Sequence, residues 1–263
     1  MRTAKDLCRL CEEHEATQKN SHLIPKFFGE GLFHGTKPRH SISIEKSGKR
    51  QKVQDTIKED FLLCPRCENG LSIFETYCSI RLRRFNDLRY FNKFEKFKKG
   101  DFEYFESKEL DIKIFNLFIY SIVWRISVSE SYAFGGFKLP IAEEEKLKSL
   151  LRKFIESSQA TLLARLDELQ VVPNHGHVMV RPKKNLRPPN AMLSAASMNG
   201  WLHEVHLVDY ILFYSTDKKR LKDSLKELDN NNLNSRVKVG LSSSESWKSY
   251  SDMMINSALK YYK

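Results

Sequence analysis

Apolar side chains recur at helical spacing through the middle of the chain, which predicts three helices separated by short breaks. The first helix covers 68–99, the second is strongly apolar and covers 111–130, and the third covers 143–164 after a break at Pro140. The positions that carry the pattern in the first and third helices are Leu71, Phe74, Tyr77, Cys78, Leu147, Leu150, Leu151 and Phe154. The middle of the chain is therefore expected to be helical.

After residue 165 the pattern changes to short apolar runs bounded by Pro, Gly and Asn, which is typical of strands. These runs cover 177–180, 191–196 and 206–213. A helical pattern returns over 217–228, and the tail from Asn230 is polar, with 242–244 expected in a loop. Helices followed by strands in one chain predict an α+β protein.

The first 80 residues hold all five cysteines and differ in texture from the rest. Within them, 34–52 is polar, basic and rich in turn residues, so we expect an exposed loop or an irregular hairpin there. We predict an N-terminal module over 1–80, a helical region over 81–165, and a small β-containing α/β region over 166–263.

The composition is that of a globular protein, with 41% hydrophobic and 29% charged residues. The formal net charge is +11. A basic surface favours polyanions, so nucleic acid is the first candidate partner. An ordinary solvated basic surface would have the same composition, and charge alone does not separate the two interpretations.

No stretch has the pattern of a targeting signal or a membrane span. Residues 1–19 lack an apolar core, and the most apolar run, 114–128, is interrupted by Asn116 and Arg125. That run is also shorter than the roughly 20 residues a spanning helix needs. We expect a cytoplasmic protein without a membrane partner, in a reducing compartment where paired cysteines are metal ligands before they are disulfides.

Two C-x-x-C pairs predict a zinc site, because four thiolates in a tetrahedron are a preferred zinc ligand set. The pairs are Cys8 with Cys11 and Cys64 with Cys67. Four protein sulfurs leave no open position, so the zinc is expected to be structural. The alternative is that one pair is redox-active or that the pairs are unrelated. Cys78 lies on a helical face and is assigned to the core.

The order of motifs around these pairs resembles the zinc-stapled HNH (His-Me finger) endonucleases over about residues 5–80. Ser21-His22-Leu23-Ile24-Pro25-Lys26 lies between the pairs, and Cys64-Pro65-Arg66-Cys67-Glu68 follows. The chain is more narrowly similar to uncharacterised bacterial proteins with an S-H-[IL]-I-P-K element and a C-x-x-C-E helix. The later stretch from Ser121 to Ser127 extends that likeness to about residue 160. The resemblance implies a ββα, treble-clef-like module.

The resemblance also implies metal-dependent hydrolysis of DNA, with His22 as the general base and Glu68 as a ligand for Mg²⁺ or Mn²⁺. Three positions depart from the family pattern: Ser21 replaces a carboxylate, Glu59 replaces an Asn that orients the histidine, and Glu68 replaces a ligating His. A second carboxylate ligand is therefore expected. Glu75 is one candidate, because it lies on the same helical face as Glu68, and Glu59 and Asp55 are the others. The alternative for His22 is a purely structural hydrogen bond, and for Glu68 and Glu75 a solvated helix face.

Basic residues inside the module are the first candidates for a phosphate track, because cations on phosphates dominate nucleic-acid affinity. These residues are Lys37, Arg39, Lys46, Lys49, Arg50 and Lys52. A basic and aromatic stretch over 81–99 is the next candidate, although a plain amphipathic helix would show the same pattern. Arg181, Lys183, Lys184 and Arg187 form a weaker patch.

Four histidines outside the module, His175, His177, His203 and His206, suggest a second metal site, but polar loop or strand-edge histidines explain the spacing more simply. The leading hypothesis is therefore an HNH-type nuclease, perhaps in anti-phage defence with a partner protein of a defence system. A second hypothesis is a non-catalytic zinc module that binds nucleic acid or a partner protein. A third places the function in 100–263, where no catalytic motif is recognised.

Overall fold

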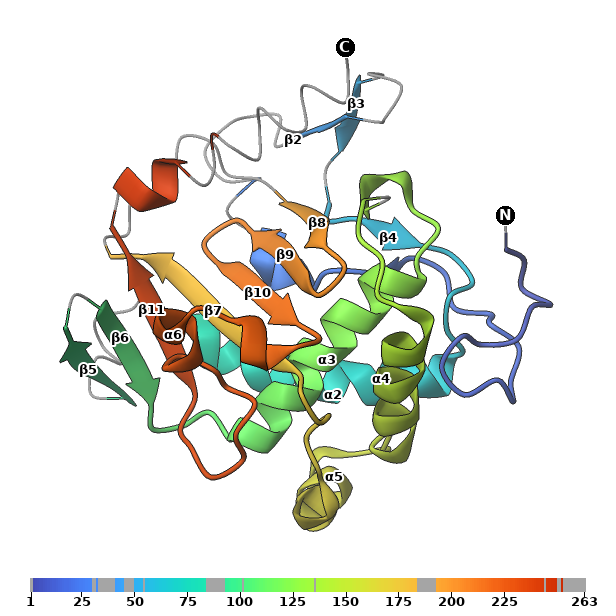
Figure 1. Ribbon diagram of the computed structural model, residues 1–263. Coiled ribbons are helices and arrows are strands. Elements are labelled where there is room, and N and C mark those ends of the chain that lie inside the picture. The colour runs from blue at the N-terminus through green and yellow to red at the C-terminus, as the bar shows by residue number, and fades with distance from the viewer. Residues whose placement is uncertain are drawn as a thin grey trace.

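A seven-stranded sheet forms the centre of the molecule (Figure 1). The computed structural model describes residues 2–29, 32, 41–44, 50–53, 55–83, 93–100, 102–134, 136–183, 193–243, 245–249 and 252. In spatial order the strands are β5 (Phe94–Lys99), β6 (Phe102–Ser107), β11 (Lys238–Ser242), β7 (Gly176–Pro182), β10 (Ile211–Ser215), β9 (Leu202–Leu207) and β8 (Leu193–Asn199). Neighbouring strands are antiparallel except β7 and β11, which are parallel.

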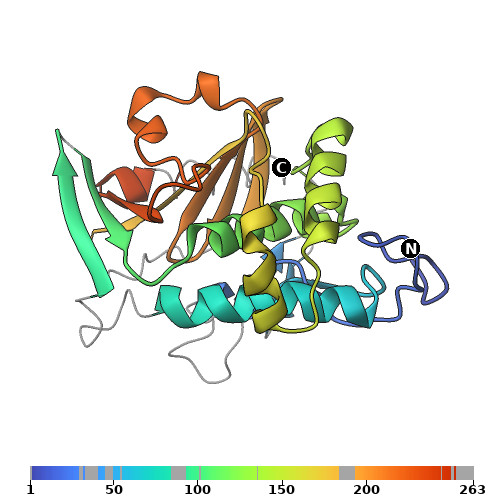
Figure 2. The same ribbon diagram turned by 90° about the horizontal axis from the view of Figure 1, so that it is seen from below.

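One helix, α3 (Ile112–Val128), lies between the sheet and a second helix, α2 (Pro65–Arg83), so that the molecule has three layers (Figure 2). Fifteen of the 17 residues of α3 are buried, which requires packing on more than one side. The helix begins at Asp111, whose Oδ1 accepts hydrogen bonds from the amides of Lys113 and Ile114 and so satisfies two otherwise free donors. This burial makes α3 the element against which the N-terminal module and the sheet both pack.

Both faces of the sheet are covered, as the alternation along β10 shows. Leu212 and Tyr214 face the large core that contains α3, whereas Ile211 and Phe213 belong to a smaller cluster with Leu228 and Trp247 on the other face. Alternate side chains of a strand point to opposite faces. The pattern therefore fixes the register of this central strand.

The remaining helices lie around these layers. They are α4 (Ile141–Lys153), α5 (Gln159–Arg165), α6 (Asp223–Lys226), and the 3-10 turns Tyr132–Phe134, Leu166–Glu168 and Lys218–Arg220. Helix α4 packs on α3. Among the described residues, no helix combines the length and the apolar character that crossing a membrane requires.

The N-terminal module contains a short antiparallel pair, β1 (Ser21–His22) with β4 (Lys58–Glu59), followed by α2. Helix α1 (Lys26–Gly29) and the hairpin of β2 (Ser41–Ile44) and β3 (Arg50–Val53) lie between those two strands in the sequence. The hairpin agrees with the expectation for 34–52. In the β1–β4 pair, Ser21 stands opposite Glu59 and His22 stands opposite Lys58.

The predicted α+β class is confirmed, as is the apolar helix over 111–130. The helix predicted over 68–99 is wrong beyond Arg83, because Phe94–Lys99 is a strand paired with Phe102–Ser107. Gly100, at a φ of 58°, supplies the left-handed backbone that a tight hairpin turn needs. The aromatic residues of this stretch pair across strands, as Phe97 does with Tyr104 at 5.4 Å between ring centroids, rather than along a helix.

Three further boundaries differ from the sequence prediction. The helix predicted over 143–164 is divided, because Ser158 caps a new helix through a capping box with Thr161. The strand predicted over 206–213 is two strands that turn at Val208, whose φ is 63°. Ser242, expected in a loop, is the last residue of β11, and the helix expected over 217–228 is only a 3-10 turn and a single helical turn.

The proposed division at residues 80 and 165 stays a prediction, but its helical middle region needs correction. That region contributes β5 and β6 to the same sheet as the C-terminal strands. One hydrophobic cluster also runs from Cys8 through α3 to Val239. The N-terminal module, the helices and the sheet therefore share a core.

Candidate metal centre and the adjoining polar site

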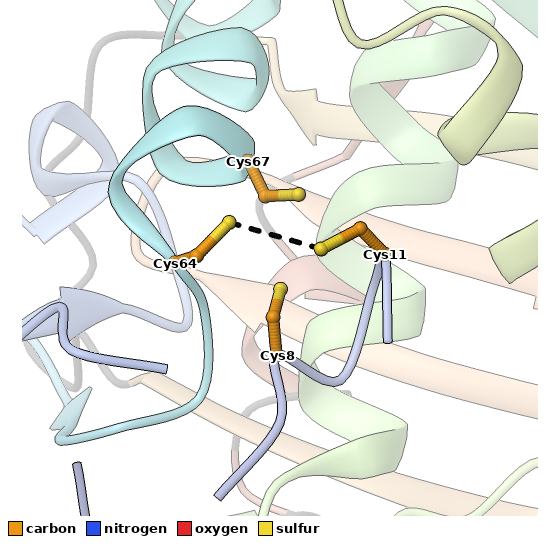
Figure 3. Close-up of side chains that lie close together, drawn as sticks. All are labelled: Cys8, Cys11, Cys64 and Cys67. Carbon is orange, nitrogen blue, oxygen red and sulfur yellow. Dashed lines mark hydrogen bonds between the residues drawn. The ribbon is translucent and has the colours of Figure 1, made fainter. Parts of the chain in front are cut away.

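The four cysteines of the two C-x-x-C pairs converge in space. All four are buried, and their sulfur atoms lie within 4.8 Å of one another. Figure 3 shows the side chains of Cys8 and Cys11, from the N-terminal loop, and of Cys64 and Cys67, from the start of α2, directed toward a common centre. The sequence prediction that the two pairs form one cluster is confirmed.

Backbone hydrogen bonds hold the two loops together around the cluster. The amide of Arg9 donates to the Leu62 carbonyl at 3.0 Å, and the amide of Gln18 donates to Leu63 at 3.2 Å. Pro65 is the first residue of α2, a position where its missing amide costs nothing. These hydrogen bonds hold together two cysteine-bearing loops that are about fifty residues apart in sequence.

The spacing of the sulfurs fits a zinc ion. A tetrahedron with Zn–S bonds of about 2.3 Å has sulfur atoms about 3.8 Å apart, and the Sγ atoms of Cys11 and Cys64 are 3.8 Å apart. The Cys8 and Cys67 thiols share a hydrogen bond that lowers the pKa of Cys8 and raises the pKa of Cys67, and burial raises the pKa of Cys64, so without a metal this pair favours one thiolate, on Cys8. Cys78 is fully buried on α2 away from this set, as expected of a core residue. The four cysteines could hold a structural zinc.

His22 lies on β1, half-buried, with 26% of its side chain exposed. Its Nε2 is 3.6 Å from Oδ1 of Asp55, and it has no hydrogen-bond partner within the described part of the chain. Burial lowers the pKa of the imidazole, although the Asp55 carboxylate acts in the opposite direction. A neutral imidazole with an unpaired nitrogen can accept a proton.

Glu68 is the first residue after the second pair, and burial raises the pKa of its carboxyl. The guanidinium of Arg125 and the hydroxyl of Ser21 oppose that increase. Oε2 of Glu68 and Oγ of Ser21 are buried atoms for which the described residues offer no hydrogen-bond partner. Both side chains therefore present unsatisfied oxygens next to the cysteine cluster.

Glu75 lies two turns further along α2, where its Oε1 forms an ion pair of 2.5 Å with Nη2 of Arg125. The negative charge of Glu75 acts to raise the pKa of both His22 and Glu68. His22 and Glu68 therefore both lie within range of the charge of Glu75. No direct contact joins His22 to Glu68, so their expected shared cavity stays a prediction.

The other two carboxylates proposed as metal ligands are engaged in local contacts. Glu59 accepts hydrogen bonds from the Ser129 hydroxyl and the Glu130 amide at the end of α3. Asp55 pairs with Lys58 at 2.7 Å and accepts from the amide of Thr56. Among the described residues, only the four cysteines form a group of three or more ligand atoms within 4.8 Å. These carboxylates therefore do not form a ready-made Mg²⁺ or Mn²⁺ site.

The candidate phosphate track falls largely outside the described residues, which exclude Lys37, Arg39, Lys46 and Lys49 and the side chain of Arg50. Lys52 is described and exposed. The next candidate, 81–99, is largely neutralised where it is described, because Lys93, Lys96 and Lys99 pair with glutamates at 2.7–2.9 Å. Arg181 of the third patch is buried, and Lys183 pairs with Glu103.

All four histidines of the sheet region are buried: His175 lies in the loop before β7, and His177, His203 and His206 lie in β7 and β9. His175 bonds Glu143 through Nε2 at 2.7 Å and Tyr214 through Nδ1 at 2.5 Å. His177 bonds Asn116 at 2.9 Å, and His203 bonds Ser197 at 2.8 Å. The described residues show no second metal group here. These histidines form buried polar contacts instead.

Sequence reasoning missed Arg125 as part of the site. The residue is fully buried in α3 and donates from Nη1 to the carbonyl of His22 at 2.6 Å. The signal for it in the sequence was a charged residue within the most apolar run of the chain. A buried charge needs a partner, and that requirement pointed to an interaction with another element.

No family model, curated protein or solved structure matches this chain. The likeness to the HNH endonucleases therefore depends on the motif residues themselves and is a proposal.

Proposed function

We propose that the N-terminal module is an HNH-type endonuclease that hydrolyses phosphodiester bonds of DNA. The order of elements supports it, since the histidine-bearing strand β1 pairs with β4 and α2 follows, as in a ββα, treble-clef-like module stapled by zinc. Four cysteines would hold the zinc between the loop before β1 and the start of α2. A closed set of four sulfurs would stabilise the module without taking part in the reaction.

The observation that carries the proposal is a set of unsatisfied polar atoms on the motif residues: Oγ of Ser21, Nε2 of His22 and Oε2 of Glu68. Buried polar atoms are normally hydrogen-bonded, so three orphans on neighbouring residues indicate bound water, an ion or a substrate. An orphan ring nitrogen alone does not mark a functional histidine, because Nδ1 of His177 and Nε2 of His203 and His206 also have no partner among the described residues. The proposal depends instead on the orphan nitrogen of His22 standing with the orphan oxygens of Ser21 and Glu68 in the motif residues.

Each residue has a role in the proposed hydrolysis. His22 would accept the proton of the attacking water, for which its lowered pKa keeps it neutral near pH 7. Glu68 would supply an oxygen ligand to Mg²⁺ or Mn²⁺, hard cations that prefer oxygen. Such an ion would neutralise charge on the phosphate and on the departing 3′ oxygen. Basic residues of 37–52 would contact the DNA backbone.

The test is nicking of supercoiled plasmid with Mg²⁺ or Mn²⁺ by wild-type protein and by His22→Ala. Removal of a general base is expected to lower the rate by about 10²- to 10⁴-fold, with zinc content unchanged. The matched control is His14→Ala, an exposed histidine of the same module whose Nδ1 lies 3.6 Å from the Cys11 sulfur. A rate that His22→Ala leaves unchanged would contradict the role of the imidazole.

A non-catalytic zinc module that binds nucleic acid or a partner protein is the second candidate. It is favoured by the engagement of Glu59 and Glu75 in contacts with α3 and by the lack of a ready-made group of carboxylate ligands in the described residues. Binding of DNA without cleavage under any divalent ion would select this candidate. A role in anti-phage defence, with a partner protein in the cytoplasm, follows from the family likeness alone.

A further inference from the structure

Arg125 is a charged side chain with 1% exposure near the end of α3, a helix whose other charged residue, Lys113, lies in its first turn. Such a charge is stable only where several groups of fixed position pair with it. The partners of Arg125 come from three elements: Nε and Nη1 donate hydrogen bonds, and Nη2 contacts a carboxylate as an ion pair.

The guanidinium joins α3 to both elements of the candidate site. Nε donates to the Ser121 carbonyl of its own helix at 3.2 Å, which fixes the plane of the group. Nη1 donates to the His22 carbonyl at 2.6 Å, and Nη2 pairs with Oε1 of Glu75 at 2.5 Å. A planar fork with donors in fixed directions can hold a strand and a helix at once, whereas a lysine ammonium cannot reproduce those directions.

We propose that Glu75 and Arg125 are a positioning pair that fixes the place of His22, and that Glu75 is not a ligand for the catalytic divalent ion. The proposal rests on the proposed nuclease function. Glu75 orients the guanidinium, the guanidinium holds the His22 carbonyl, and the backbone of His22 sets the direction of its imidazole. The pair therefore acts through His22 and touches no reacting atom.

Charge and geometry both oppose a divalent ion on Glu75. An ion bound there would have to displace Arg125, leaving a guanidinium with 1% exposure without its carboxylate. It would also lie close to that positive charge, since the carboxylate and the guanidinium are in contact. Glu68 has no such ion pair and retains an unpartnered Oε2. The two glutamates of α2 thus have different roles, although sequence spacing places them on one face.

The two roles predict different responses to substitution, and Glu75 is the safer residue to change because 22% of its side chain is exposed. Glu75→Gln keeps a side-chain oxygen facing Nη2 of Arg125, so kcat for nicking should stay within about threefold of wild type. Glu75→Ala removes that oxygen, and misplacement of His22 by about 1 Å should lower kcat by up to about 100-fold. KM for DNA and the Mg²⁺ concentration for half-maximal rate should change less than twofold in both.

Glu68→Gln is the comparison, because loss of a metal ligand should raise the Mg²⁺ concentration for half-maximal rate. Glu145→Gln, an exposed glutamate of α4, is the control for charge removal. Glu75→Gln that is as slow as Glu75→Ala and needs more Mg²⁺ would identify Glu75 as a metal ligand and overturn the proposal. Zinc content and melting temperature measured on each variant separate these effects from unfolding.

A second measurement tests the pair even if the wild type cleaves no DNA, in which case the proposed function fails by itself. Imidazole signals of ¹⁵N-labelled protein, with His22 assigned from its loss in His22→Gln, report the surroundings of the ring. Glu75→Ala should shift or broaden the His22 signals, and Glu75→Gln should leave them near the wild-type positions. Unchanged His22 signals in Glu75→Ala, with zinc retained, would overturn the positioning pair whatever the enzymatic result.

Discussion

The N-terminal module and the seven-stranded sheet both surround histidines with protein, and the sheet holds satisfied as well as unsatisfied ring nitrogens, because Nδ1 of His177 and Nε2 of His203 and His206 have no hydrogen-bond partner among the described residues. In the sheet region, His175 has Glu143 on one nitrogen and Tyr214 on the other. In the module, Nε2 of His22 is buried, 3.6 Å from a carboxylate, and has no hydrogen-bond partner among the described residues. Burial lowers the pKa of both imidazoles. A lowered pKa alone therefore does not identify a functional histidine.

The two regions also gain their order from different sources. The sheet is covered on both faces and is held by backbone pairing and apolar packing. In the module, strands β1 and β4 have two residues each, and a pair this short could not be stable in water by itself. Its cysteine cluster and its contacts with α3 supply what those strands lack. Removal of the metal should therefore separate the two regions experimentally.

Zinc removal is expected to have the largest effect. Structural zinc in isolated zinc-finger peptides binds with about 10–16 kcal/mol, so Cys64→Ser should lose the metal and unfold the module. Amide hydrogen exchange should rise first in 2–29 and 55–64, while β7 and β10 stay protected. Cys78→Ala, a change of a buried cysteine outside the cluster, should retain one zinc per chain. A Cys64→Ser protein with unchanged zinc content and melting temperature would refute the site.

Acid should act mainly on the sheet region, because burial lowers the pKa of His177 to about 3 and of His203 to about 4. In the unfolded chain both titrate near 6.5. Between these values the unfolded state binds more protons, so stability is full above pH 6.5 and falls with decreasing pH. Each histidine contributes a slope of about 1.4 kcal/mol per pH unit.

Denaturant melts between pH 7 and pH 4.5 check this slope. His203→Gln should make the pH dependence shallower, and the exposed His14→Gln should leave it as in wild type. A slope that persists in His203→Gln and in a matching His177→Gln protein would assign the acid sensitivity to other groups.

The cysteine cluster could be predicted from sequence because it depends on spacing alone: two C-x-x-C pairs and one metal geometry. The helix over 112–128 was equally accessible, since a long and mostly apolar run preceded by Asp111 has few alternatives. The strand at 94–99 was not, because its aromatic residues fit a helical period and their true partners lie on β6. Cross-strand contacts of this kind are not encoded in the local pattern.

The candidate site was predictable only as far as motif order extends. His22 and Glu68 follow from the motifs, and the structure does bring both near Glu75. The engagement of Glu75 by Arg125 could not be foreseen, because it depends on how α3 packs across α2, fifty residues further along the chain. The pairing of Glu59 with the end of α3 is hidden for the same reason.

Binding of DNA should depend on the module and not on the sheet. Charge reversal of Lys49, Arg50 and Lys52 together should weaken binding to all sequences alike, because phosphate contacts carry no sequence information. Each lost contact should also reduce the salt dependence, with a slope smaller by about 0.9 per phosphate on duplex DNA. Reversal of Lys98, on β5 of the sheet, is the control, and anisotropy titrations at several salt concentrations measure both. Unchanged affinity in the triple variant would move the interface elsewhere.

The smallest expected effect concerns the exposed ion pairs that connect the module to α4. Nζ of Lys148 lies 2.6 Å from Glu12, and more than half of the Glu12 side chain is exposed. Hydrogen bonding to Lys148 lowers the pKa of Glu12, so this contribution is present above about pH 4.5 and is lost in acid. Solvent screening limits such a pair to about 0–1 kcal/mol. A double-mutant cycle with Glu12→Gln and Lys148→Met should give a coupling in that range that disappears in 1 M salt. A coupling well above 1 kcal/mol that salt does not reduce would mean that surface charges, and not zinc and Arg125, attach the module to the rest of the molecule.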